Sequence, residues 1–162
     1  MSELENDMVE GPANTDDQTL VIHELHIPYT TFCVLCEGAT TLPDGAVDIS
    51  RIVNRWTIQG VTPPFALEFW IAIGFKGLTP NTAEPVRIIF INEDDRAIIS
   101  MSQPTIISDT QELNLFSHAE RFPVPKFGNY RMSVLYQTKE IGRFGFEVVS
   151  GDQEERRIGV PE

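Results

Sequence analysis

The sequence predicts an all-β protein, an antiparallel immunoglobulin-like β-sandwich of about seven to nine strands, and three observations support this class. The first is residues 63–77, PPFALEFWIAIGFKG, in which large apolar side chains occupy every odd position from Phe65 to Phe75. This two-residue period is typical of a strand that buries one face. The second is a series of short apolar runs separated by turn-forming residues. The third is that no convincing crossover helix separates those runs.

The N-terminal half predicts a strand pair and an ambiguous return segment. Apolar, β-branched-rich runs at 19–25 and 29–37 predict strands, and Asp44-Gly45 is a strong signal for a hairpin turn. In the return segment 46–59, apolar residues have helical spacing in one reading and strand spacing with one parity slip in the other. We favour a strand with a β-bulge near Ser50–Ile52, because an extra residue there produces the slip.

The second half of the chain predicts further short strands. Prolines 63 and 64 predict a turn before the long strand, and residues 92–96 form the polar tip of a predicted hairpin. Pro123 is expected to end the strand that begins at Glu112. The predicted strands after the long one are 86–91, 97–101, a short one at 104–107, 112–122, 130–136 and 141–148.

Charge and composition suggest three parts. Residues 1–18 hold six acidic residues and no basic one, which predicts a disordered acidic tail. We expect the sandwich to span 19–149 and a polar tail to span 150–162. The net charge of −12 without a basic stripe argues against a nucleic acid or an anionic membrane as partner. With no signal-like N-terminus and no long apolar run, the expected location is cytoplasmic.

Five short motifs can be compared with known patterns: FCVLCEGATTLPDGAVDI, Trp56-Thr57-Ile58, Pro63-Pro64, Gly128-Asn129-Tyr130 and the hairpin at 139–149. Together they resemble an uncharacterised bacterial β-sandwich domain family. The resemblance spans roughly 29–149 and implies an immunoglobulin-like sandwich. It implies no activity, since that family is one of unknown function. The acidic tail and the extra N-terminal strand are departures from its pattern.

A zinc site is the sharpest metal pattern, because His23, His26, Cys33 and Cys36 lie within fourteen residues. However, Cys33 and Cys36 would lie about 10 Å apart on one strand and point to opposite faces. This separation also excludes a disulfide between them. We therefore expect two buried free cysteines and no metal or other cofactor.

Calcium binding and catalysis have weaker signals. Acidic residues at 93–95, or Asp44 and Asp48, could supply carboxylate ligands for calcium, although acidic hairpin tips are common. His118, beside Ser117 and near Glu120, is the one histidine of the second half, and no nucleophile motif accompanies it.

The remaining candidate is a binding surface on the even-numbered face of the long strand, made of Ala66, Glu68, Trp70, Ala72 and Gly74. A large aromatic residue on a bed of small ones suits a protein partner or self-association. The alternative is that Trp70 is shielded by the stems of Arg87 or Arg131, or by the N-terminal segment. Trp56 is expected in the core.

The function expected from the sequence is therefore that of a non-enzymatic protein-interaction or structural module. Its partner would be an unknown protein or a second copy of the chain. The first alternative is a ligand-binding sandwich that takes carbohydrate or calcium through loops 40–46, 77–85 and 92–96. The second alternative, a hydrolase-type enzyme, has the least support.

Overall fold

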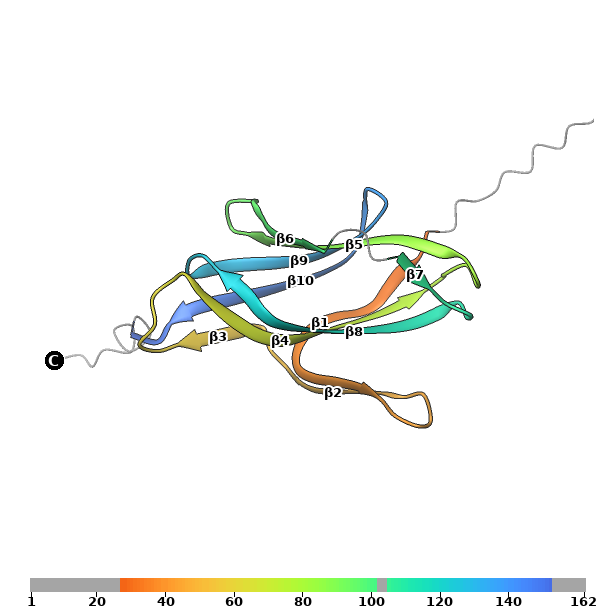
Figure 1. The fold of residues 1–162 in the computed structure, drawn as a ribbon, viewed down its shortest axis with the longest axis horizontal. Helices are drawn as coiled ribbons and strands as arrows, with labels where there is room; N and C mark the ends of the chain where they lie inside the picture. Colours follow the sequence, from red (N-terminus) through yellow and green to blue (C-terminus); the bar gives the residue numbers. More distant parts are fainter. Residues whose placement is uncertain (1–26, 102–104, 153–162) are drawn as a thin grey trace, which may run out of the picture.

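The alternating stretch forms the long strand β4 (Phe65–Lys76), as predicted, and its odd-numbered side chains face a second sheet. The computed structural model describes residues 27–101 and 105–152, which form two facing sheets (Figure 1). The predicted all-β, two-sheet sandwich is therefore confirmed. The N-terminal tail at 1–18, the strand expected at 19–25 and most of the C-terminal tail lie outside the described residues.

The smaller sheet has four strands in the order β2-β1-β4-β8. Besides β4, they are β1 (Tyr29–Thr41), β2 (Val47–Ile52) and β8 (Glu112–Val124). All three pairings are antiparallel. We call this the four-stranded sheet.

The larger sheet has the order β3-β10-β9-β5-β6, with β7 paired to the first part of β5. Its strands are β3 (Arg55–Ile58), β5 (Ala83–Asn92), β6 (Ala97–Met101), β7 (Thr105–Ile107), β9 (Gly128–Tyr136) and β10 (Lys139–Ser150). The pairing of β3 with β10 is parallel, and the others are antiparallel. We call this the six-stranded sheet.

The core lies between the two sheets and is rich in aromatic side chains. Phe69, Phe90, Phe122 and Phe146 pack together with ring centroids 4.8–6.4 Å apart. Trp56 adds its ring at 5.5 Å from both Phe69 and Phe146, which confirms its expected place against the core. Since these rings come from both sheets, their burial holds the layers together.

The prediction for residues 46–59 was wrong in one respect. The segment is neither a helix nor one bulged strand, because β2 belongs to the four-stranded sheet and β3 to the six-stranded sheet. The chain crosses between the layers at Val53–Asn54, two residues after Arg51, which has a φ of 45°. The Val53 N–H donates to Leu35 O (2.8 Å) in the first sheet, and Asn54 O accepts from Glu147 (2.9 Å) in the second. This crossing produces the parity slip. It also divides one predicted strand into two, which is one reason why the described residues hold ten strands and not the seven to nine predicted.

Pro123 does not end its strand, contrary to expectation, and β8 continues to Val124. Proline lacks an N–H donor, which is tolerated at a sheet edge, and β8 is the edge strand of its sheet. Phe122 and Val124 are also fully buried opposite β4, so continuing the strand completes the core.

The β1–β2 hairpin extends away from both layers (Figure 1). β1 pairs with β4 only from Tyr29 to Cys36, and its remainder pairs with β2 alone. The predicted turn is confirmed, with Gly45 at a φ of 84°. Within the described residues there is no helix of the length and apolar character that a membrane crossing requires.

Candidate functional site

The even-numbered side of β4 faces away from the core, and its small residues are less open than expected. Ala66 and Glu68 are exposed, Trp70 is partly buried, and Ala72 is fully buried. Gly74 is covered as well, since a Cβ added there would lie 2.4 Å from both the Phe32 ring and Thr31 Oγ1. Of the small residues expected to surround Trp70, Ala72 and Gly74 are therefore covered, and only Ala66 is exposed.

Side chains from neighbouring strands form an apolar patch on the outer face of the four-stranded sheet. Across the sheet, Val34 of β1 and Phe116 of β8 flank Ala72 in register, so the three side chains share one face. Phe32, Val34, Trp70 and Phe116 are each partly buried. We call these four residues the outer patch.

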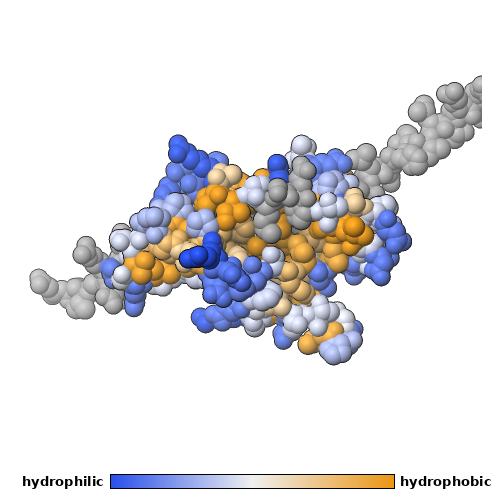
Figure 2. All heavy atoms as spheres, in the orientation of Figure 1, coloured by the Kyte–Doolittle hydropathy of each residue, from blue (hydrophilic) through white to orange (hydrophobic). Residues whose placement is uncertain are grey.

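The alternative of shielding by arginine stems is wrong for the two arginines named. Arg87 lies on β5 and Arg131 on β9, both in the six-stranded sheet. Their side chains are therefore on the opposite layer from Trp70. Figure 2 shows hydrophobic residues across the middle of the molecule in one view, interrupted by a group of hydrophilic residues near the centre.

Trp70 is held on one side by His118. Their rings stack with centroids 4.8 Å apart and planes inclined by 18°. His118 in turn lies with Nε2 3.0 Å from Glu68 Oε1 and with Nδ1 3.9 Å from Glu120 Oε1. These contacts hold the imidazole in place, and the imidazole covers one face of the indole.

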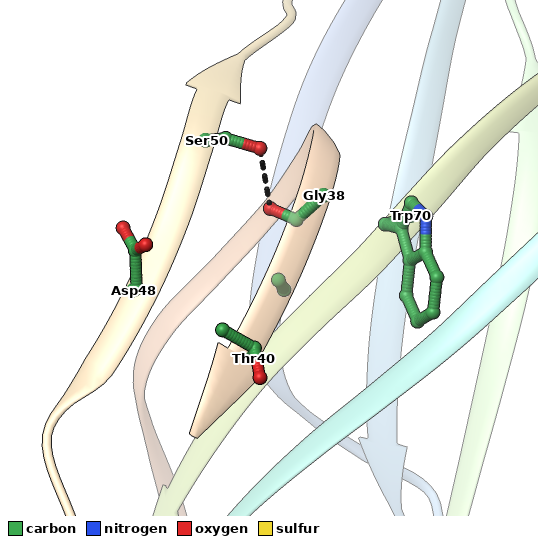
Figure 3. A pocket seen from close by; sticks show the side chains of 6 residues that line it. Gly38, Thr40, Asp48, Ser50 and Trp70 are labelled. Carbon is green, nitrogen blue, oxygen red and sulfur yellow. Dashed lines mark hydrogen bonds between the residues drawn. The ribbon is translucent and has the colours of Figure 1, made fainter. Parts of the chain in front are cut away.

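A hollow of about 240 Å³ opens beside Trp70, lined also by Gly38, Ala39, Thr40, Asp48 and Ser50. Figure 3 shows the indole on one side of the Gly38–Thr40 backbone, and the Asp48 carboxylate and Ser50 hydroxyl on the other. Ser50 Oγ donates to Gly38 O at 3.2 Å. Among the described residues, no ion pair involves Asp48. The hollow thus combines an aromatic wall, hydroxyl groups and a carboxylate without a cationic partner.

The cysteines lie on opposite faces of β1, as the strand period predicts. Cys33 belongs to the core, and burial, with a smaller effect from Glu140, raises the pKa of its thiol to about 12. Cys36 is also fully buried but points to the outer face, where its Sγ donates to Trp70 O at 3.8 Å. Burial raises the pKa of the Cys36 thiol too. Both thiols are free and poorly suited to act as thiolates.

No metal site is assembled in the part of the chain that the structure describes. Within it, no three His, Cys, Asp or Glu residues lie close enough to bind one ion together. His23 and His26 lie outside the described residues, so their meeting with the cysteines stays untested.

The acidic loops suggested for calcium are engaged in protein contacts. In the β5–β6 turn, Glu93 and Asp94 each lie 2.8 Å from Lys126 Nζ, and these hydrogen bonds lower the pKa of both carboxyl groups. In the β1–β2 turn, Asp44 Oδ1 accepts from the Ala46 N–H at 3.0 Å. Glu93 and Asp94 are therefore engaged by Lys126 and Asp44 by its own turn, whereas Asp48 has no ion pair among the described residues.

His118 has acidic neighbours but no nucleophile beside it. Ser117 is adjacent in a strand and therefore points to the opposite face. Ser117 and His118 both line a second hollow of about 190 Å³, but no hydrogen bond joins their side chains among the described residues. Cys36 shares the outer face, but Trp70 lies between it and His118 in the register. No nucleophile–base pair is formed by these groups.

Comparison with known proteins gives two structural matches to report. No family model matches the chain, and neither does any curated protein. One matching structure is the alkylpurine DNA glycosylase AlkC of Pseudomonas fluorescens, with 8% identity and a TM-score of 0.46. The match covers 75% of this chain and 30% of the glycosylase chain.

The other structure is described as an immunoglobulin-like protein from Pseudomonas aeruginosa. It has 11% identity and a TM-score of 0.44, and the match covers 75% of this chain and 96% of that one. Neither match supplies a function for this chain.

Proposed function

We propose that this protein is a non-enzymatic protein-interaction module that binds a partner protein through the outer face of its four-stranded sheet. The observation that carries the proposal is the outer patch around Trp70, with the adjoining hollow. Aromatic and aliphatic side chains at the centre of a face, surrounded by polar groups, are typical of protein interfaces.

The charges on this face favour a different protein over a second copy of the chain. Its strands carry five acidic residues, Glu37, Asp48, Glu68, Glu112 and Glu120, against three basic ones, Arg51, Lys76 and Arg121. A symmetric dimer would place this face against itself, which brings like charges together. A partner with complementary charge avoids that repulsion.

Site-specific photo-crosslinking tests the proposal. A photoreactive phenylalanine analogue is placed in the full chain at Ala66, an exposed position on the outer face. The matched control carries it at Gly145, an exposed strand position of the other sheet where an added Cβ would meet nothing within 4 Å. We expect crosslinks to a discrete protein from position 66 that the change Phe116→Ser abolishes.

Two results would count against the proposal. One is that positions 66 and 145 give the same products, and the other is that Phe116→Ser leaves the products unchanged although the variant keeps its circular dichroism spectrum. Light scattering of the purified chain checks the choice of partner. A dimeric mass that Phe116→Ser reduces to a monomer would favour self-association instead.

A ligand-binding sandwich remains the second candidate, because the hollow beside Trp70 has features that also suit a sugar ring. An indole face and neighbouring hydroxyl and carboxylate oxygens can stack on and hydrogen-bond to a carbohydrate. Thermal unfolding in the presence of neutral disaccharides tests it, since a bound ligand raises the melting temperature by mass action.

A further inference from the structure

The hollow beside Trp70 has the chemistry of a site for a positively charged side chain. An aromatic face attracts a cation within about 6 Å of the ring centroid, and a nearby carboxylate strengthens the attraction. Trp70 supplies the ring on one side of the Gly38–Thr40 backbone and Asp48 the carboxylate on the other, and both line one hollow of about 240 Å³ (Figure 3). We propose, on the basis of the function proposed above, that this hollow receives a lysine or arginine side chain from a basic segment of the partner.

The contacts around the hollow explain why the cation would bind there. The other carboxylates of this face have cationic or imidazole partners nearby, since Glu112 lies 2.9 Å from Lys76 and both Glu68 and Glu120 lie beside His118. Asp48 has no ion pair among the described residues. It is therefore the carboxylate of this face that an incoming cation can neutralise without breaking an existing contact.

His118 further restricts the binding geometry. Its imidazole stacks on one face of the Trp70 indole, so a bound group has only the remaining parts of the ring available. The backbone of β1 also lies close to the Ser50 side chain at Gly38, where an added Cβ would be 2.8 Å from Ser50 Oγ. Glycine at this position therefore keeps the floor of the hollow open. A long, slender cationic side chain fits this shape better than a bulky apolar one.

Nuclear magnetic resonance of the full ¹⁵N-labelled chain tests the inference. The probes are the blocked peptides Gly-Lys-Gly and Gly-Arg-Gly, and the matched control peptide carries Nε-acetyl-lysine, which has the same stem without the charge. We expect both basic peptides to shift the Trp70 indole N–H resonance, which Trp70→Phe identifies by its loss. The Trp56 resonance is the internal control, because that ring packs between the layers.

Charge-removing variants locate the site. Asp48→Asn should weaken binding of the lysine peptide about fivefold, the effect of losing an exposed ion pair of about 1 kcal/mol. Asp95→Asn removes the same charge from the β5–β6 hairpin and should leave the affinity unchanged. Higher salt should weaken binding to the wild-type chain more than to Asp48→Asn.

The outcomes separate this inference from the proposed function. If the acetylated peptide or a neutral disaccharide shifts the Trp70 resonance as strongly as the lysine peptide, the cationic assignment is overturned. If no peptide moves the resonance while position 66 still crosslinks to a partner, the interaction function stands and the lysine or arginine site does not. If position 66 gives no specific crosslink, the proposed function fails independently of the peptide result.

Discussion

Gly74 is the residue through which the outer face closes over β4. The Phe32 ring and the Thr31 hydroxyl occupy the space that a side chain at position 74 would need. Phe32 can therefore lie flat against the strand as part of the outer patch. This close approach, and not a special backbone angle, is what requires glycine there.

Gly74→Ala should consequently destabilise the protein. The new Cβ would lie 2.4 Å from two side-chain atoms, and overpacking of this kind costs about 1–3 kcal/mol. Urea unfolding followed by fluorescence measures the change in the free energy of unfolding.

Gly145→Ala is the matched control, because its Cβ would meet nothing within 4 Å. It should change the free energy of unfolding by less than about 0.5 kcal/mol. Equal effects of the two substitutions would mean that crowding at Gly74 does not determine the stability.

Some of the site could be predicted residue by residue, and some could not. The two-residue period placed Trp70 on the outer face and Cys33 and Cys36 on opposite faces of one strand. The same period could not place Asp48 at the hollow beside Trp70 or Phe116 opposite Ala72, because they lie on other strands. These placements depend on strand order and register, which a single sequence does not state.

Among the elements, the far end of the β1–β2 hairpin has the fewest strands paired beside it. From Ala39 to Thr41, β1 pairs only with β2, and no second strand flanks the pair on that side. By contrast, β4 pairs with β8 along its whole length and with β1 from Trp70 to Lys76, and it buries most of its odd-numbered side chains. The hairpin is therefore an element of low local stability attached to a stable sheet.

Hydrogen exchange should reveal this difference. The hydrogen-bonded amides of the hairpin between 39 and 49 should exchange several orders of magnitude faster than those of Ile71 and Ile73 in β4, since a weakly packed element opens without global unfolding. Exchange measured by nuclear magnetic resonance checks this directly. Equal protection in the two elements would show that contacts absent from the described residues support the hairpin.

The elements were predicted well where turn chemistry and alternation agree. The β5–β6 and β9–β10 hairpins follow the predicted runs closely, because each turn lies between two clear alternating strands. The prediction for 46–59 was wrong because a strand that changes sheets and a bulged strand leave the same parity slip. The prediction that Pro123 ends its strand was wrong because the breaking effect of proline depends on whether the strand is at an edge.

For the whole molecule, the aromatic core makes the two sheets one unit. Phe69 and Phe122 come from the four-stranded sheet, and Phe90 and Phe146 come from the six-stranded sheet. Each ring contacts rings of the other layer. Neither sheet can therefore separate without exposing the whole cluster to water.

The two tryptophans allow a direct test of this cooperativity. Trp56→Phe leaves Trp70 as a reporter of the four-stranded sheet, and Trp70→Phe leaves Trp56 as a reporter of the six-stranded sheet. In each variant, we expect unfolding by fluorescence to coincide with unfolding by far-ultraviolet circular dichroism. A fluorescence midpoint separate from that of the circular dichroism would show that one sheet unfolds before the other.

The crossing between β2 and β3 also has a consequence for the time course of folding. β3 pairs with β10, so nearly the whole sandwich must be synthesised before β3 finds its partner. β4 likewise waits for β8, and until then one of its edges is unpaired. Contacts between such distant parts of a chain form slowly. A nascent chain that has completed only its first four strands therefore presents an unpaired apolar edge, and the last strand made is the one that completes the fold.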